Sequence, residues 1–313
     1  MQQLKICSAA RRSLGRSIAR WARPGTAAVL AVAAVAALGT TSAKADLIVS
    51  VDDPGEPLWL IDVDTNTYTP ILSGYGAQAI ANDANTSTLY FMTNTVTLYR
   101  WEYGMGNAPE LIGNTTNPNG TSPNTSITGL GFDNAGDTLY GTRTLGATNV
   151  PEGLYTINTD TAVTSLVGAF PSEFDIGAFD IDPVTGTAYG FSDGNTSGAG
   201  IGLYQIDLTD GSSTLVAPAP PGSIPSGEAR PDIDGLAVGD GKIYLVEDDA
   251  VQAGGTIYVY DIATGMYETP LQTPWFFNET FSGATWVADG AFVPEPASLG
   301  LLGLAGLALV RRR

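Results

Sequence analysis

The 313-residue sequence has no histidine and a single cysteine, and these absences exclude several kinds of chemistry. Without histidine there is no Ser-His-Asp triad, no Cys-His pair and no imidazole ligand for a metal ion. Cys7 has no second thiol with which to form an intramolecular disulfide or a zinc cluster. Basic residues are also few, 14 against 32 acidic ones. We therefore expect no nucleic-acid partner, because phosphates demand clusters of Lys and Arg.

Most of the basic residues lie at the two ends of the chain. Residues 1–45 contain seven bases and no acid, and the last three residues are all arginine. Residues 46–296 hold all 32 acidic residues and only four bases, a net charge of −28. The sequence thus divides into a strongly acidic body and two basic ends.

The basic N-terminal end has the features of a secretory signal peptide. Its bases precede an apolar run, Thr26–Leu38, and a small-x-small sequence, Ala43-Lys44-Ala45, follows. This run is too short for a permanent membrane helix, which needs about 20 apolar residues. We therefore predict a signal peptide over residues 1–45, cut by signal peptidase before Asp46, with Ala43 and Ala45 as the recognised residues. Cys7 would be removed with it, which suits an exported protein.

The C-terminal end, residues 293–313, combines three features in a fixed order. Pro294, Glu295 and Pro296 come first, an uncharged run from Ala297 to Val310 follows, and Arg311, Arg312 and Arg313 close the chain. As a helix this run would reach about 21 Å, short of the ~30 Å hydrocarbon core. The segment resembles the PEP-CTERM sorting signal of Gram-negative and related bacteria. The resemblance implies recognition by an exosortase, removal of the tail, delivery to the cell surface and at least transient membrane attachment through an apolar C-terminal helix.

Residues 46–292 repeat one pattern of four short strands about five times. The first strands align on Ile80, Leu130, Phe179, Leu236 and Ala284, which are 50, 49, 57 and 48 residues apart. Second strands fall at 88–93, 138–142, 187–191 and 242–247, and third strands at 58–62, 98–102, 154–158, 203–207 and 257–261. Fourth strands fall at 68–72, 108–112, 163–167, 212–216 and 267–271. Short alternating segments bounded by turn residues are typical of β-structure.

Four strands repeated every 40 to 50 residues predict the blades of a β-propeller. The blade that begins at Gly283 lacks a second strand, and Leu47–Val51 at the other end of the body supplies it. We therefore predict an all-β, five-bladed propeller whose last blade is closed by both chain ends. A β-solenoid or paired sandwiches are alternatives. A sandwich would not repeat one strand pattern five times, and a solenoid does not need the two chain ends to complete one blade. The repeats resemble those of propeller lectins and of many secreted bacterial proteins.

Propeller connectivity predicts that one face of the ring is acidic. Loops entering the first strands and loops leaving the second strands share that face. The candidate ligand-binding residues on these loops are Asp52, Asp175, Asp193, Asp232, Asp234 and Asp248. Carboxylates without countercharges repel one another unless a cation lies among them, and Ca²⁺ prefers such oxygen ligands. The alternative is a solvated surface in which Asp serves solubility and turn formation. Arg143 and Arg230 fall on the same loops and either pair with these acids or orient an acidic ligand.

From these features we expect a non-enzymatic, exported binding or structural protein of the cell surface or extracellular matrix. The sorting tail implies an association with exopolysaccharide. Beyond a possible Ca²⁺ ion we expect no cofactor. The competing hypothesis is a secreted polysaccharide hydrolase or lyase that uses Asp180 with Asp182, or Asp232 with Asp234, as acid and base. For Tyr99, Tyr155, Tyr204, Tyr258 and Trp59, which recur at one strand position, packing between blades is favoured over a carbohydrate platform.

Overall fold

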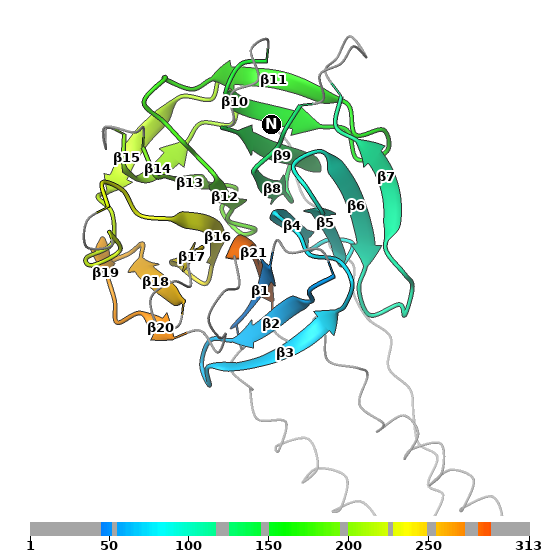
Figure 1. Cartoon of the computed structure of the whole chain (residues 1–313), viewed down its shortest axis with the longest axis horizontal. Helices are drawn as coiled ribbons and strands as arrows, with labels where there is room; N and C mark the ends of the chain where they lie inside the picture. Colours follow the sequence, from blue (N-terminus) through cyan, green and yellow to red (C-terminus); the bar gives the residue numbers. More distant parts are fainter. Residues whose placement is uncertain are drawn as a thin grey trace, which may run out of the picture. The chain divides into compact units, whose positions relative to one another are not determined.

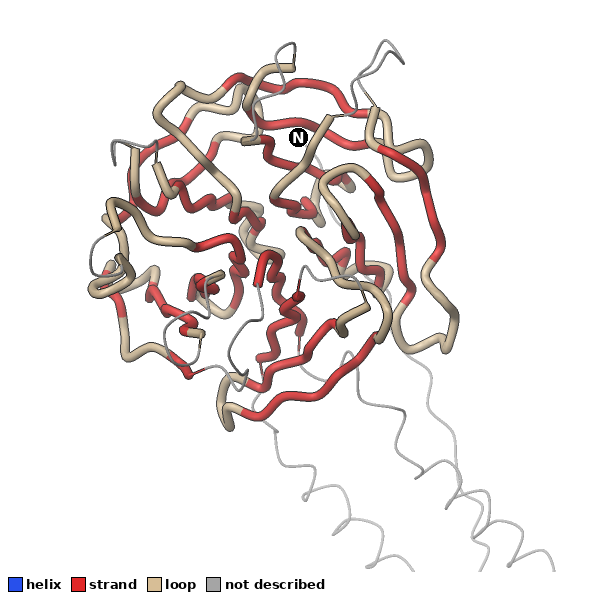
Figure 2. The backbone as a smooth tube through the Cα atoms, viewed as in Figure 1, coloured by secondary structure: helices blue, strands red, loops and turns tan. Residues whose placement is uncertain are grey.

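The computed structural model describes residues 45–51, 55–116, 125–144, 150–194, 200–224, 228–248, 255–272 and 281–288. Every regular element within these ranges is a β-strand, as Figure 2 shows. No helix in this part of the chain is long and apolar enough to cross a membrane. The predicted signal peptide, apart from Ala45, and the predicted sorting tail lie outside the described residues.

The strands form five antiparallel sheets, each built around four strands (Figure 1). The blades are numbered from the N-terminal end of the described chain, and the strands of each are given from the innermost outward. Blade 1 contains β21 (Phe281–Ala288), β1 (Ala45–Val51), β2 (Leu58–Asp62) and β3 (Thr67–Leu72). Blade 2 contains β4 (Ala79–Asp83), β5 (Thr88–Met92), β6 (Thr97–Glu102) and β7 (Glu110–Asn114). Blade 3 contains β8 (Gly129–Asp133), β9 (Thr138–Arg143), β10 (Gly153–Ile157) and β11 (Thr164–Ala169).

The last two blades follow the same plan. Blade 4 contains β12 (Ala178–Ile181), β13 (Ala188–Ser192), β14 (Gly202–Ile206) and β15 (Ser213–Ala217). Blade 5 contains β16 (Ile233–Gly239), β17 (Lys242–Glu247), β18 (Thr256–Asp261) and two short outer strands, β19 (Met266–Tyr267) and β20 (Leu271–Gln272). The sequence predicted one outer strand here, over 267–271. The structure divides it around Thr269 and Pro270, and proline has no N–H to give to a sheet.

The five innermost strands form a closed ring, in which β4, β8, β12, β16 and β21 each contact the next and β21 contacts β4 (Figure 1). The chain is therefore a five-bladed β-propeller, as predicted. Strand β21 pairs with β1 through Val287 opposite Asp46 and Trp286 opposite Leu47. Both ends of the described chain thus complete blade 1, which confirms the predicted mode of closure.

The predicted alignment of the first strands is also correct. The residue after each aligned first-strand position lies opposite the same position of the second strand in every blade. These pairs are Ala81 with Tyr90, Gly131 with Tyr140, Asp180 with Tyr189, Ala237 with Tyr244, and Thr285 with Ile48. The recurring aromatic residues of the third strands lie in the packed layers, since Tyr155, Tyr204 and Tyr258 are buried and Tyr99 stacks on Phe91.

Polar contacts tie the closing strand β21 to other blades. The Asn82 side-chain amide of blade 2 donates to the carbonyl of Trp286 at 2.9 Å. Asp180 of blade 4 is buried, and its carboxylate accepts from the Val238 N–H at 3.0 Å and lies 3.5 Å from the Thr285 hydroxyl. Burial raises the pKa of Asp180 well above its ordinary value, against the opposing effect of the N–H donors. Asp180 is therefore a buried link between blades 4, 5 and 1.

Candidate functional site

A polar cavity of about 220 Å³ opens where the innermost strands begin, and we call it the mouth. Every blade contributes to its lining. The lining residues are Gln78, Thr95, Thr128, Thr144, Asp175, Gly177, Asp193, Arg230, Asp232, Asp234 and Ser282. The mouth is thus the place where loops from all parts of the ring converge, as propeller connectivity predicted.

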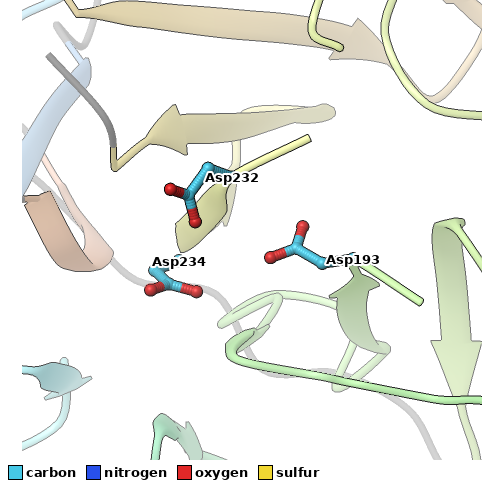
Figure 3. Close-up of side chains that lie close together, drawn as sticks. All are labelled: Asp193, Asp232 and Asp234. Atoms are coloured by element: carbon cyan, nitrogen blue, oxygen red, sulfur yellow. The ribbon is translucent and has the colours of Figure 1, made fainter. Parts of the chain in front are cut away.

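Three carboxylates of blades 4 and 5 come together in the mouth (Figure 3). Carboxylate oxygens of Asp193, Asp232 and Asp234 lie within 4.8 Å of one another. Asp193 follows β13 directly, and its carboxylate accepts from the Ile233 N–H at 3.3 Å. The Asp193 N–H donates to the Asp175 carbonyl at 3.0 Å, so the backbone holds this loop beside the entry to β12.

Two β-bulges shape the rim. Ile233 lies opposite Glu247 and Gly235 opposite Val246, which leaves Asp234 as an extra residue in β16. In β21, Phe281 lies opposite Val51 and Gly283 opposite Ser50, so Ser282 is the extra residue at the equivalent position. A bulge re-aims the side chain of the inserted residue. Both inserted residues, Asp234 and Ser282, line the mouth.

Asp193 is the one buried carboxylate among the described residues that line the mouth. Its side chain is only 8% exposed, and burial raises its pKa to about 9, with the charges of Asp234, Asp232 and Asp175 acting in the same direction. The Ile233 N–H partly offsets this effect. Arg230 also lines the mouth and lies 3.4 Å from the Asp175 carboxylate in an exposed ion pair.

The lining is divided into two chemically different halves. The acidic residues come from blades 4 and 5, whereas blades 1, 2 and 3 contribute hydroxyl and amide groups. The neutral groups are Gln78, Thr95, Thr128, Thr144 and Ser282. The Thr128 and Thr144 hydroxyls lie 3.2 Å apart, and the Ser282 hydroxyl donates to the Ala77 carbonyl at 3.3 Å. The carboxylates of such a cavity can bind a cation. The neutral oxygens can either complete the coordination shell of that cation or bind a polar ligand.

The predicted candidates are partly brought together. Asp175, Asp193, Asp232 and Asp234 line the mouth. Asp248 is not among the lining residues; its N–H donates to the Asp232 carbonyl at 2.8 Å and its carbonyl accepts from Phe281. Asp52 lies outside the described residues.

Asp180 and Asp182 do not form a shared site. Asp180 is enclosed between innermost strands, whereas the carboxylate of Asp182 accepts from Val184, Thr185 and the Thr185 hydroxyl in the turn after β12. Thr95 and Thr144 also line the mouth, although they were not among the predicted candidates. The one sequence feature that could have indicated them is their position, because Thr95 lies in the loop after β5 and Thr144 directly follows β9.

Comparison with known proteins identifies the C-terminal segment. Residues 292–313 match the PEP-CTERM protein-sorting motif. The motif implies export, processing by an exosortase and a final place at the membrane or cell surface. No curated protein sequence matches the chain.

Several solved structures are similar over most of the chain. A structural-genomics protein of unknown function from Bacteroides thetaiotaomicron has 18% identity and a TM-score of 0.48, over 77% of this chain and 64% of its own. TolB from Acinetobacter baumannii has 14% identity and a TM-score of 0.47, over 79% and 67% of the two chains. Apo AztD from Citrobacter koseri has 17% identity and a TM-score of 0.34, over 80% and 64%. The chain thus spans about 64% of the length of the Bacteroides protein.

Proposed function

We propose that the protein is a non-enzymatic binding component of the bacterial surface or extracellular matrix, and that its mouth binds a divalent cation or a cationic ligand. The sorting motif supports the location, and extracellular polysaccharide is the partner we expect there. The observation that carries the binding proposal is the convergence of Asp193, Asp232 and Asp234 within 4.8 Å.

The chemistry of the mouth suits a hard cation. Ca²⁺ takes six to eight oxygen ligands and accepts irregular geometry. The three carboxylates supply the charge, and the hydroxyl and amide oxygens across the cavity together with water complete the shell. A bound cation would also remove the mutual repulsion that, with burial, keeps a proton on Asp193 near neutral pH.

Calcium binding is tested by titration calorimetry on the purified full chain at pH 7. We expect one site, with a melting temperature that rises as Ca²⁺ reaches millimolar concentration. Asp234→Asn and Asp193→Asn each remove one charged ligand and should weaken binding about tenfold or more.

The matched control is Asp261→Asn. This carboxylate caps an exposed turn by accepting from the Thr264 N–H at 2.7 Å, and asparagine can make the same bond. Wild-type affinity in this variant is expected. If neither Ca²⁺ nor a cationic probe such as spermidine binds the wild-type chain at millimolar concentration, the mouth is not a cation site.

A hydrolase or lyase is the second candidate function, because the same residues resemble an acid and base pair. Asp193, with a pKa of about 9, holds a proton at neutral pH and lies beside Asp232 and Asp234. Incubating the chain with matrix polysaccharides and measuring new reducing ends or unsaturated products distinguishes the two functions. We expect no product. Release of product that is abolished by Asp232→Asn or Asp234→Asn would overturn the non-enzymatic proposal.

A further inference from the structure

Blades 3 and 4 carry equivalent grooves on the face of the ring opposite the mouth. Each groove lies between the two hairpin turns of its blade. The blade-3 groove, about 550 Å³, is lined by Asp137, Thr138, Leu139, Thr156, Ile157, Asn158, Thr159, Thr161, Val163 and Ser165. The blade-4 groove, about 420 Å³, is lined by Gly186, Thr187, Ala188, Gln205, Ile206, Asp207, Leu208, Thr209, Ser212 and Thr214.

The strand pairings show that these linings correspond position by position. Thr156 lies opposite Tyr140 on one side and Ser165 on the other. Gln205 lies in the same way between Tyr189 and Thr214. The first turns also match, since Asp137 and Gly186 both adopt a positive φ, of 50° and 70°. The two cavities are therefore one structural feature repeated in neighbouring blades.

Blades 2 and 5 carry an ion pair at the same place. In blade 2, Arg100 and Glu110 occupy the positions of Thr156 and Ser165, and their side chains bond at 2.8 Å. In blade 5, Lys242 bonds Glu268 at 2.6 Å across the space between the two hairpins. Two of the four basic residues of the acidic body thus lie at this position. In blade 2 a smaller cavity of about 250 Å³ remains beside the ion pair. The grooves of blades 3 and 4 are larger, and Thr156, Ser165, Gln205 and Thr214 replace the paired charges there.

The open grooves offer neutral hydrogen-bonding groups. Thr156, Ser165 and Thr214 present hydroxyls that both donate and accept, and Gln205 presents an amide with two donors and an acceptor. Ser165, Gln205 and Thr214 are exposed. The charged groups in the two linings are acidic, Asp137 and Asp207, so an anionic ligand would be repelled. The chemistry fits a neutral ligand rich in hydroxyl groups.

We propose that the grooves of blades 3 and 4 are two equivalent subsites for a neutral saccharide chain. The proposal goes beyond the function of the mouth, because it concerns other residues on the other face of the ring. Strand β21 ends at Ala288 on this same face, beside the start of β1. Two neighbouring subsites raise the local concentration of a long chain once one is occupied, so polysaccharides should bind more tightly than short oligosaccharides.

The test introduces Arg and Glu, the residues of the blade-2 ion pair, at the equivalent positions of the two grooves in the full chain. One variant carries Thr156→Arg with Ser165→Glu, a second carries Gln205→Arg with Thr214→Glu, and a third carries all four changes. Binding to immobilised dextran, laminarin and galactomannan is measured by biolayer interferometry, with polygalacturonate as an anionic comparison. We expect at least one neutral polysaccharide to bind. Filling one groove should then weaken binding about tenfold or more, and filling both should abolish it.

The control variant carries Leu166→Thr and Leu215→Thr. These exposed side chains follow Ser165 and Thr214 in the same outer strands and point to the other side of the sheet, so binding should not change. Asp234→Asn in the mouth should also leave this binding unchanged, which separates it from the function of the mouth. The proposal is overturned if no neutral polysaccharide binds, if polygalacturonate binds as well as the neutral chains, or if the four-residue variant binds as the wild type does while remaining folded by circular dichroism.

Discussion

A chain that ends at residue 280 is expected to lose its cooperative unfolding transition, whereas a chain that ends at residue 288 keeps it. The difference is strand β21, which lies innermost in blade 1 and buries Phe281, Trp286 and Val287. Each buried side chain of this size contributes about 1.5–3 kcal/mol. Their combined loss is comparable with the whole stability of a typical domain, about 5–15 kcal/mol.

The measurement is thermal unfolding followed by near-ultraviolet circular dichroism on both truncated chains and on the full chain. The longer truncation is the control for removal of the sorting motif, because it keeps every strand of the ring. Equal transitions in the two truncated chains would show that β1 can close blade 1 without β21. Recovery of the transition on adding a peptide of residues 281–288 to the shorter chain would locate the effect in this strand.

The stability of the protein is expected to fall as the pH rises from about 4 toward 9. The folded-state pKa of Asp193 is about 9, whereas an unfolded Asp has a pKa of about 3.9. Below pH 4 both states carry the proton; between the two pKa values only the folded state does. The unfolded state then binds fewer protons, so the free energy of unfolding decreases by up to about 1.4 kcal/mol per pH unit. Asp180 contributes in the same direction.

Asp193→Asn should flatten this dependence and make the protein more stable than the wild type at pH 8. The groups that face Asp193 are Asp175, Asp232, Asp234 and the Ile233 N–H, with Arg230 paired to Asp175. Urea unfolding at pH 4, 6 and 8 with a chelator present measures the effect. Asp261→Asn should retain the wild-type slope, because the Thr264 N–H lowers the pKa of Asp261 and leaves it ionised over this range. An unchanged slope in Asp193→Asn would mean that Asp193 is ionised in the folded protein.

Much of the ring follows from local patterns in the sequence. Strand positions and register were predictable because each blade repeats the same apolar positions, and Ile80, Leu130 and Phe179 hold equivalent places in their strands. The convergence of Asp193 with Asp232 was predictable as well, since both lie at strand ends that a propeller brings to one face.

Other features depend on contacts that have no local signal. The bulges at Asp234 and Ser282 depend on how many residues the partner strand offers, so neither strand alone predicts them. Asp180 occupies a position that is alanine or glycine in blades 2, 3 and 5, and only the folded ring shows that its carboxylate reaches Val238 of the next blade. The ion pair of Arg100 with Glu110 requires the pairing of β6 with β7, which places the two residues opposite one another.

The placement of β21 has a consequence for the order of synthesis, because the strand that closes the ring is made after all the other described strands. The innermost position of blade 1 is filled by the last described strand of the chain, so a nascent chain that stops before residue 281 lacks this strand. The sorting motif begins at residue 292, just after β21 ends at Ala288. A chain that carries this motif has therefore also been supplied with the strand that closes its fold. The order of the two segments thus makes the sorting motif a marker of synthesis that has passed the closing strand.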